Sequence, residues 1–201
     1  MLVVGKTAAK QLLAEEKNVT KSSTSQKSKP RIKADPIAST TWNDLSQQIN
    51  AVIAEHGDLD ISVAIIDIAT NTSANYGIQD SFAGASNTKV LTAAAYLDAV
   101  ENGERKLTAS INGTTAKQQI SNMTNQSDNN AWAALNQNLS YTTIEEYAAS
   151  IGITSYKAKN NVITASDEAL LLQKLYQRAL LNEENTTLLL SYMQETNNEA
   201  M

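Results

Sequence analysis

The 201-residue sequence contains no cysteine and a single histidine, His56. Without cysteine, disulfide bonds, thiolate nucleophiles and zinc–thiolate sites are excluded. One histidine likewise cannot supply a histidine-rich metal site. Two common kinds of enzyme site are therefore ruled out before any motif is considered.

Long apolar runs and a basic folded surface are also missing. No run approaches the roughly 20 apolar residues that cross a bilayer. Residues 1–33 hold eight basic and two acidic residues, whereas the remainder holds eight basic and nineteen acidic residues. Because nucleic-acid binding requires a basic face on the folded part, the acidic body argues against a nucleic-acid partner.

Proline is scarce, and both prolines lie in the Ser/Thr/Lys-rich stretch 18–40. We interpret residues 1–40 as a basic leader and flexible linker, and residues 41–201 as one folded domain. A disordered leader is the simpler interpretation; the functional one is a tether that holds the domain away from a membrane or wall. The opening "MLVV" is too short for a signal peptide but fits the end of a membrane tether upstream of residue 1.

The hydrophobic pattern predicts a helix, then a hairpin, then a long helical block. Residues 42–56 carry apolar side chains at helical spacing, with Thr40 or Thr41 as the N-cap. The β-branched segments 60–71 and 73–80 predict a two-stranded hairpin. Further helices are expected at 86–100, 115–125, 128–138, 142–150, 166–180 and 184–195, with a loop at 152–163. The predicted fold class is α+β, an antiparallel sheet packed against a mostly helical part.

The stretch "GASNTKVL" places Lys89 among apolar residues, three positions after Ser86. Residues three apart lie on one face of a helix, so these side chains are placed to touch. If Lys89 is buried, desolvation lowers its pKa and leaves a neutral amine able to take the Ser86 proton. Gly84 and Ala85 leave space around the hydroxyl, and the Ser86 N–H supplies half of an oxyanion hole. The alternative is a Ser86 N-cap and a surface lysine.

A second motif, Ser127-Asp128-Asn129, lies between two predicted helices. A hydroxyl and a carboxamide two positions apart on a loop can both face one cleft. Ser127 is then placed to relay a proton to a leaving group, and Asn129 to hold a substrate amide. In the alternative interpretation, Ser127 or Asp128 only caps the helix that follows.

Four segments together carry a family resemblance: "FAGASNTKVL", "SNMTNQSDNNAWAAL", "YAASIGI" and "NNVITASDEALLLQKLY". They resemble the penicillin-recognising serine hydrolases, class A β-lactamases in particular. The resemblance covers about residues 41–201. Thr164 and Asp167 match the Thr-x-x-Asp segment that opens the family's next long helix.

The resemblance implies a role for each residue of the two motifs. Ser86 would be the acylated nucleophile and Lys89 its activating base. Ser127 would shuttle the proton, and Asn129 would bind the amide carbonyl of the substrate. It implies no metal and no other cofactor.

The chain departs from the family pattern in two places. No Lys-Thr-Gly triad follows Asn129, although the family carries one on a later strand that completes the cleft. We therefore expect only the first hairpin of the sheet to be present, in a domain truncated at its C-terminus whose natural protein continues past Met201. The loop 152–164 also contains no Glu or Asp, where class A β-lactamases carry the glutamate that activates the deacylating water. Deacylation should then be slow.

These features predict a serine acyl-transfer hydrolase acting on β-lactams or on D-Ala-D-Ala-type amides of peptidoglycan stem peptides. By resemblance it is extracytoplasmic, at the cell wall or membrane. The competing interpretation is a non-catalytic domain of the same fold that binds the wall or a partner. A third interpretation, a purely helical adhesion or scaffold protein, requires that 60–77 form no hairpin. The sequence does not indicate the oligomeric state.

Overall fold

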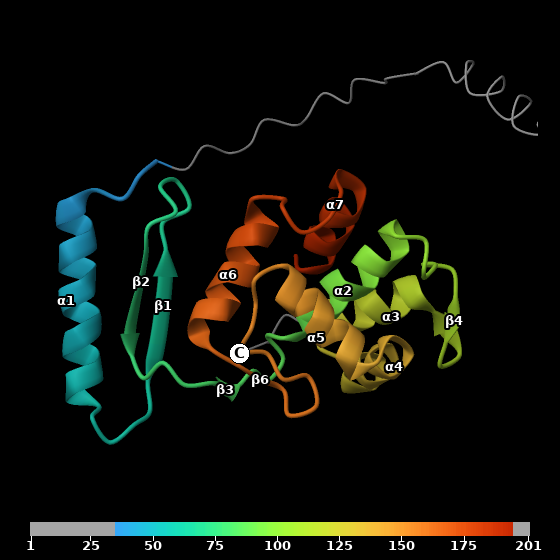
Figure 1. Cartoon of the computed structure of the whole chain (residues 1–201), viewed down its shortest axis with the longest axis horizontal. Helices are drawn as coiled ribbons and strands as arrows, with labels where there is room; N and C mark the ends of the chain where they lie inside the picture. The colour runs from blue at the N-terminus through green and yellow to red at the C-terminus, as the bar shows by residue number, and fades with distance from the viewer. Residues whose placement is uncertain (1–34, 195–201) are drawn as a thin grey trace, which may run out of the picture. The chain divides into compact units, whose positions relative to one another are not determined.

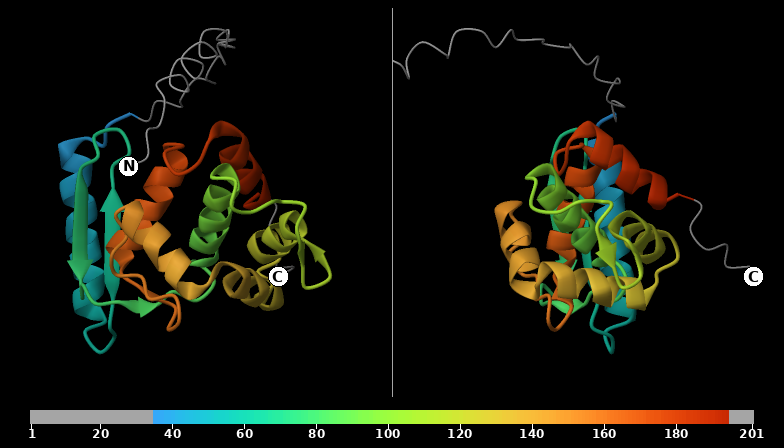
Figure 2. Two further views of the ribbon diagram at one scale, coloured as in Figure 1. Left: turned by 45° about the vertical axis from the view of Figure 1, so that its right-hand side comes forward. Right: turned by 90° about the vertical axis from the view of Figure 1, so that its right-hand side faces the viewer.

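The computed structural model describes residues 35–194. Most of the predicted leader therefore lies outside the described residues. The described chain begins with helix α1 (Ser39–Glu55) and a hairpin of strands β1 (Ser62–Ile66) and β2 (Ser73–Gly77). The remaining helices gather on the other side of the hairpin from α1, as Figure 1 and the left view of Figure 2 show.

The predicted hairpin forms, which excludes a purely helical protein. β1 and β2 are antiparallel, with Ser62 opposite Gly77 and Ile66 opposite Ser73. Asp67 ends β1 and organises the turn, because its carboxylate accepts hydrogen bonds from the Ala69 N–H and the Thr70 hydroxyl, both at 2.8 Å. Helix α1 packs against β2, and α6 (Ala165–Tyr176) packs against β1.

Helix α1 begins earlier than predicted, and none of its residues is fully buried. Its N-cap is Ala38, with no capping side chain, so the prediction of Thr40 or Thr41 as N-cap was wrong. The helix also begins two residues inside the predicted linker. It packs against β2 of the two-stranded hairpin, and Val52 remains 52% exposed. Within residues 35–194, no helix is long and apolar enough to span a membrane.

The helical block follows the predicted order with small changes at the ends. Its helices besides α6 are α2 (Lys89–Glu101), α3 (Ala116–Asn125), α4 (Asn129–Leu139), α5 (Tyr141–Ser150) and α7 (Glu183–Tyr192). The predicted helix 86–100 thus begins only at Lys89. The three preceding residues form a tight turn instead.

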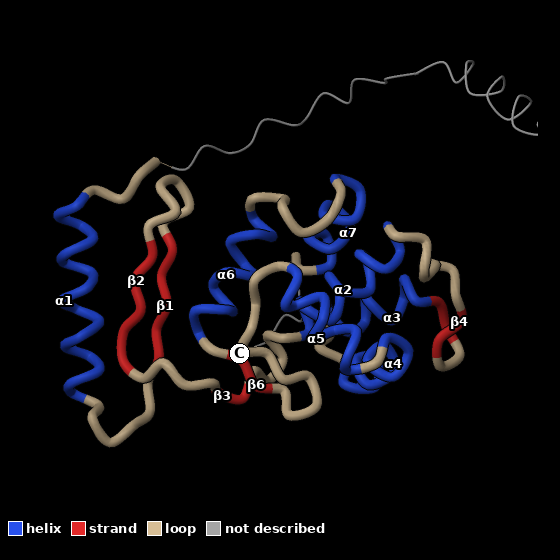
Figure 3. The backbone as a smooth tube through the Cα atoms, viewed as in Figure 1, coloured by secondary structure: helices blue, strands red, loops and turns tan. Residues whose placement is uncertain are grey.

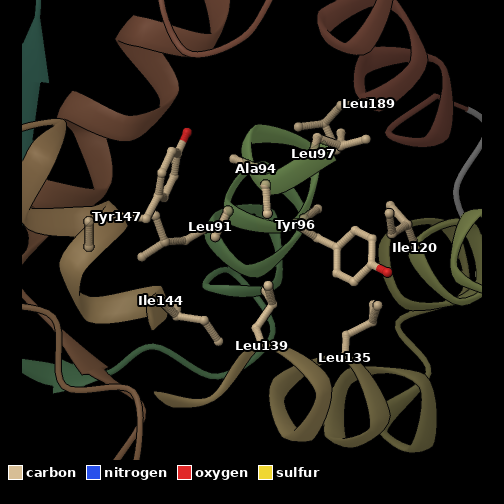
Figure 4. Close-up of a cluster of buried hydrophobic side chains, with 14 of the residues drawn as sticks. Leu91, Ala94, Tyr96, Leu97, Ile120, Leu135, Leu139, Ile144, Tyr147 and Leu189 are labelled. Atoms are coloured by element: carbon tan, nitrogen blue, oxygen red, sulfur yellow. The ribbon is translucent and has the colours of Figure 1, made fainter. Parts of the chain in front are cut away.

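Helix α2 is the centre of the hydrophobic core. Its sequence is apolar on every side, as expected for a helix that is surrounded rather than half-exposed. Figure 4 shows its side chains pointing outward in several directions, with Tyr96 directed at Ile120 of α3 and Leu135 of α4. Each fully buried Leu contributes roughly 1.5–3 kcal/mol of burial free energy. The core therefore holds the start of α2 rigidly in place.

Two small ladders were not predicted (Figure 3). β3 (Phe82–Ala83) pairs with β6 (Val162–Ile163), so the predicted loop 152–163 ends in a strand. β4 (Ser110–Ile111) pairs with β5 (Thr114–Thr115) across an Asn-Gly turn. The first ladder matters for the site, because it joins the segment before Ser86 to the loop before α6.

Gly84 does not open space around Ser86, as the sequence had suggested. It is buried, and an added Cβ would lie 2.3 Å from Thr88 Cγ2 and 3.3 Å from Ile163 Cγ2. The glycine is instead required for close packing between β3, β6 and the turn before α2. This packing gives a direct stability test.

We expect Gly84→Ala to lower the stability of the full chain by about 1–3 kcal/mol, because the methyl group forces Thr88 and Ile163 apart. Thermal unfolding followed by circular dichroism measures the effect. Gly57→Ala is the matched control, since its Cβ would approach nothing closer than 3.7 Å. Equal melting temperatures for the two variants would contradict this packing account.

Candidate active site

Ser86 lies in a tight turn that leads into α2. The turn is made by backbone hydrogen bonds from Asn87 N to Gly84 O and from Lys89 N to Ser86 O, at 3.1 and 3.2 Å. Ala85, just before the serine, has a left-handed φ of +46°. The N-cap of α2 is Thr88 rather than Ser86, so the Ser86 side chain is not used in capping and is exposed.

Lys89 is buried at the first turn of α2, with 3% of its surface exposed. Its Nζ lies 3.2 Å from Ser86 Oγ and 3.0 Å from Ser127 Oγ. It donates hydrogen bonds to two carbonyl oxygens, Ser127 O at 2.6 Å and Asn129 Oδ1 at 2.7 Å. The alternative of a surface lysine that reaches water is therefore wrong.

Burial lowers the pKa of the Lys89 amine, because desolvation disfavours the charged form. The nearby Asp128 carboxylate opposes this shift without cancelling it. The ring of Trp132, 5.6 Å from Nζ, also favours the cation. Trp132 is held over the amine by its indole N–H, which donates to Thr92 Oγ1 at 3.0 Å.

The Ser-Asp-Asn motif brings its hydroxyl and its carboxamide to the same amine. Ser127 has a left-handed φ of +54°, and its hydroxyl donates to Ser86 Oγ at 2.9 Å. Asp128 is the N-cap of α4 and accepts from Asn130 N at 2.7 Å. Capping therefore falls to the middle residue of the motif, which leaves the side chains of Ser127 and Asn129 directed at Lys89.

The arrangement suits proton transfer when the amine is neutral. A neutral amine has two N–H donors and one lone pair. The carbonyl oxygens of Ser127 and Asn129 occupy the two donors, so the lone pair is left for a hydroxyl proton. Ser86 and Ser127 both lie close enough to Nζ to provide that proton.

The loop before α6 is tied shut at its base. Thr164 is the N-cap of α6 and accepts from Asp167 N at 3.2 Å. The Asp167 carboxylate accepts from the backbone N–H groups of Thr154 and Ser155 and from the Ser155 hydroxyl, at 2.7–2.9 Å. The Thr-x-x-Asp segment therefore closes a loop that spans residues 154–164.

Asn161, in this loop, was missed by the sequence analysis. Its side chain donates to Ala85 O at 2.9 Å and accepts from the Thr88 hydroxyl at 2.5 Å. The sequence around it, Lys-Asn-Asn, is typical of a solvated loop and gives no indication of a contact with the Ser86 turn. Only the folded chain brings Asn161 against the turn that carries Ser86.

A hollow of about 500 Å³ lies between β1, the segment 82–87 and the start of α6. Its lining includes Gly84 and Asn87 on one side and Glu168 on the other. Glu168 Oε2 is buried and has no hydrogen-bond partner among the described residues, and burial raises the pKa of this carboxyl. Glu145, on α5, accepts from Ala158 N at 2.7 Å.

Among residues 35–194, no three acidic or histidine side chains are grouped as metal ligands. The candidate site therefore consists of hydroxyl, amine and amide groups. It combines two neighbouring hydroxyls with one buried amine at the start of a core helix.

A model of the β-lactamase enzyme family matches residues 44–201. The chain belongs to the β-lactamase enzyme family. This finding confirms the resemblance to penicillin-recognising serine hydrolases, and the matched segment contains both motifs. No curated protein matches the sequence.

Solved structures of class A β-lactamases share the fold of this family member. TLA-3 extended-spectrum β-lactamase has 18% identity and a TM-score of 0.68, over 78% of this chain and 70% of that chain. A β-lactamase from Sphaerobacter thermophilus has 22% identity and a TM-score of 0.65, over 78% of this chain and 71% of that chain. A class A β-lactamase described as the last common ancestor of Gram-negative bacteria has 21% identity and a TM-score of 0.65, over 74% of this chain and 69% of that chain. The predicted α+β, β-lactamase-like class is confirmed.

The Glu168 carboxyl makes stability depend on pH. Burial raises its pKa in the folded chain above the unfolded value of about 4.3. The stability that the protonated carboxyl contributes to the folded chain is therefore fully present below about pH 4.3. The contribution is lost as pH rises through the raised folded pKa. Glu168→Gln removes this loss, so we expect its melting temperature to rise relative to wild type between pH 4 and pH 8.

Thermal unfolding at several pH values checks this expectation. Glu146→Gln, at an exposed position of α5, is the matched control. A difference between Glu168→Gln and wild type that stays constant from pH 4 to pH 8 would show that the Glu168 carboxyl does not titrate abnormally.

Proposed function

We propose that the chain is an active-site-serine acyl-transfer hydrolase that acts on β-lactams or on the D-Ala-D-Ala-type amides of peptidoglycan. The observation that supports this most strongly is the contact of Ser86 Oγ with both Lys89 Nζ and Ser127 Oγ, at 3.2 and 2.9 Å. Membership of the β-lactamase family supports the substrate class.

In the proposed reaction, Lys89 takes the hydroxyl proton of Ser86, and the freed Oγ attacks the carbonyl carbon of the substrate. The carbonyl C–N bond then breaks. The Ser127 hydroxyl gives its proton to the leaving nitrogen and recovers one from Lys89. The product of this half-reaction is an ester on Ser86, which water later hydrolyses.

Two donors would hold the substrate carbonyls. Among the described residues, the Ser86 N–H has no acceptor, so it is free to stabilise the oxyanion at the start of α2. Asn129 accepts from Lys89 through Oδ1, and this orients its Nδ2 group away from the amine. Because Asn129 is exposed, Nδ2 can donate to an amide carbonyl of the substrate.

The ester is expected to be long-lived, because the loop 152–164 contains no carboxylate to activate water. Trapping of the acyl group favours a peptidoglycan-directed or lactam-binding enzyme over an efficient resistance enzyme. Turnover of a chromogenic cephalosporin separates these two activities.

We expect a fluorescent penicillin to label the wild-type chain covalently at Ser86. Ser86→Ala removes the attacking oxygen, so its labelling should be abolished. In-gel fluorescence, with peptide mapping of the adduct, measures the result. Ser110→Ala, which removes an exposed hydroxyl on β4, is the matched control and should label like wild type.

Absence of labelling in wild type would contradict the enzyme and favour the alternative, a non-catalytic β-lactamase-fold domain that binds the wall or a partner. The missing loop carboxylate is the observation that favours this alternative. Labelling that persists in Ser86→Ala would place the nucleophile elsewhere.

The rate of labelling should rise with pH and then level off. Lys89 acts as a base only when neutral, and its lowered pKa brings the neutral form in at lower pH. The midpoint should therefore lie below the value of about 10.4 that an exposed lysine shows. Initial labelling rates between pH 5 and pH 10 give the profile, and a midpoint at the exposed-lysine value would contradict a buried base.

The proposed substrates favour a location outside the cytoplasmic membrane, because peptidoglycan stem peptides are cross-linked there. We propose an extracytoplasmic location at the cell wall or membrane. A basic, Ser/Lys-rich leader suits attachment near an anionic wall or membrane surface.

A further inference from the structure

The turn that carries Ser86 is conformationally strained. Ala85 adopts a left-handed φ of +46°, which its Cβ disfavours. Such a conformation persists only where the surrounding structure holds it. Ala85 is exposed, so packing around its side chain does not provide the support.

Asn161 contacts both ends of this turn. Its Nδ2 donates to Ala85 O, and its Oδ1 accepts from the hydroxyl of the fully buried Thr88. Its backbone carbonyl also accepts from Gly84 N at 2.8 Å. Three hydrogen bonds from one residue therefore enclose Ser86, which lies between the residues they contact.

The residue type suits this task. The turn offers a carbonyl oxygen on one side and a hydroxyl donor on the other, and a carboxamide donates to the first and accepts from the second through two different atoms. Asn161 itself has a left-handed φ of +50°, which asparagine tolerates better than most residues. The loop that presents it is closed at its base by Asp167, so its position is defined.

We propose that Asn161 is a positioning residue for Ser86. Its amide holds the left-handed Ala85 peptide, and this directs Ser86 Oγ at Lys89 and Ser127. The inference rests on the proposed function of Ser86. It assigns to the loop before α6 the task of orienting the nucleophile, rather than of supplying a base.

The first experiment measures the rate of Ser86 acylation by fluorescent penicillin in the full chain. Asn161→Gly removes the amide without straining its own left-handed backbone. We expect the acylation rate constant at saturating probe to fall about tenfold, since small misplacements of a nucleophile are costly. The probe concentration that gives half-maximal rate should stay unchanged. Asn160→Gly, at the exposed neighbouring asparagine, should behave like wild type.

A second substitution distinguishes positioning from general stability. Glycine adopts a positive φ without strain, so Ala85→Gly should restore much of the rate lost in Asn161→Gly. A loss of general stability would not be repaired this way. If Asn161→Gly does not fold, Asn161→Asp replaces it, since it keeps the acceptor for Thr88 and loses only the donor to Ala85.

Nuclear magnetic resonance gives a readout independent of activity. In a chain with labelled alanine, the Ala85 signal is assigned by its loss in Ala85→Gly, and its amide–α-proton coupling reports φ. We expect Ala85 to leave the left-handed conformation in Asn161→Gly. An unchanged coupling, or a wild-type acylation rate in that variant, would overturn the inference.

The two proposals fail in different ways. A wild-type chain that penicillin does not label refutes the proposed function, and the Ala85 coupling then decides the role of Asn161. A wild-type chain that is labelled, with an Asn161→Gly variant labelled equally fast, refutes the positioning role alone.

Discussion

The site depends on the hydrogen bonds of one buried amine. Lys89 reaches from the first turn of α2 to Ser127 O, in the loop before α4, and to Asn129 Oδ1, at the start of α4, and both oxygens accept from it. Burying a lysine without partners would be very costly, so these two acceptors are what allow it to lie inside. The same contacts join two helices and leave the amine facing two hydroxyls. The contacts that hold Lys89 inside the fold therefore also direct its amine at Ser86 and Ser127.

Part of the backbone strain of the described residues lies around the site. Ala85, Ser127 and Asn161 all have left-handed φ values although none is glycine. Each such residue costs of the order of 1–3 kcal/mol and must be supported by its surroundings. The buried residues of α2 provide a rigid base, and the loop closed by Asp167 supports the turn from the other side. Stability in the core thus offsets strain in the turn that presents Ser86.

Local patterns predicted the parts of this structure that depend on local interactions. The spacing of Ser86 and Lys89 indicated their proximity, although the turn, rather than a helix, holds the serine. The Asn112-Gly113 hairpin was missed despite a strong turn signal in the sequence. The β3–β6 ladder and the contacts of Asn161 join segments more than 70 residues apart, and two-residue strands leave no periodic pattern. No local reading of the chain could have predicted them.

The most direct test of this account is the titration of Lys89 itself. Nuclear magnetic resonance of the full chain with isotope-labelled lysine side chains follows each amine as pH rises, and Lys89→Met identifies the signal. The account predicts that Lys89 loses its proton at a clearly lower pH than the other lysines, because it is desolvated beside Ser86. A midpoint equal to that of the exposed lysines would contradict it.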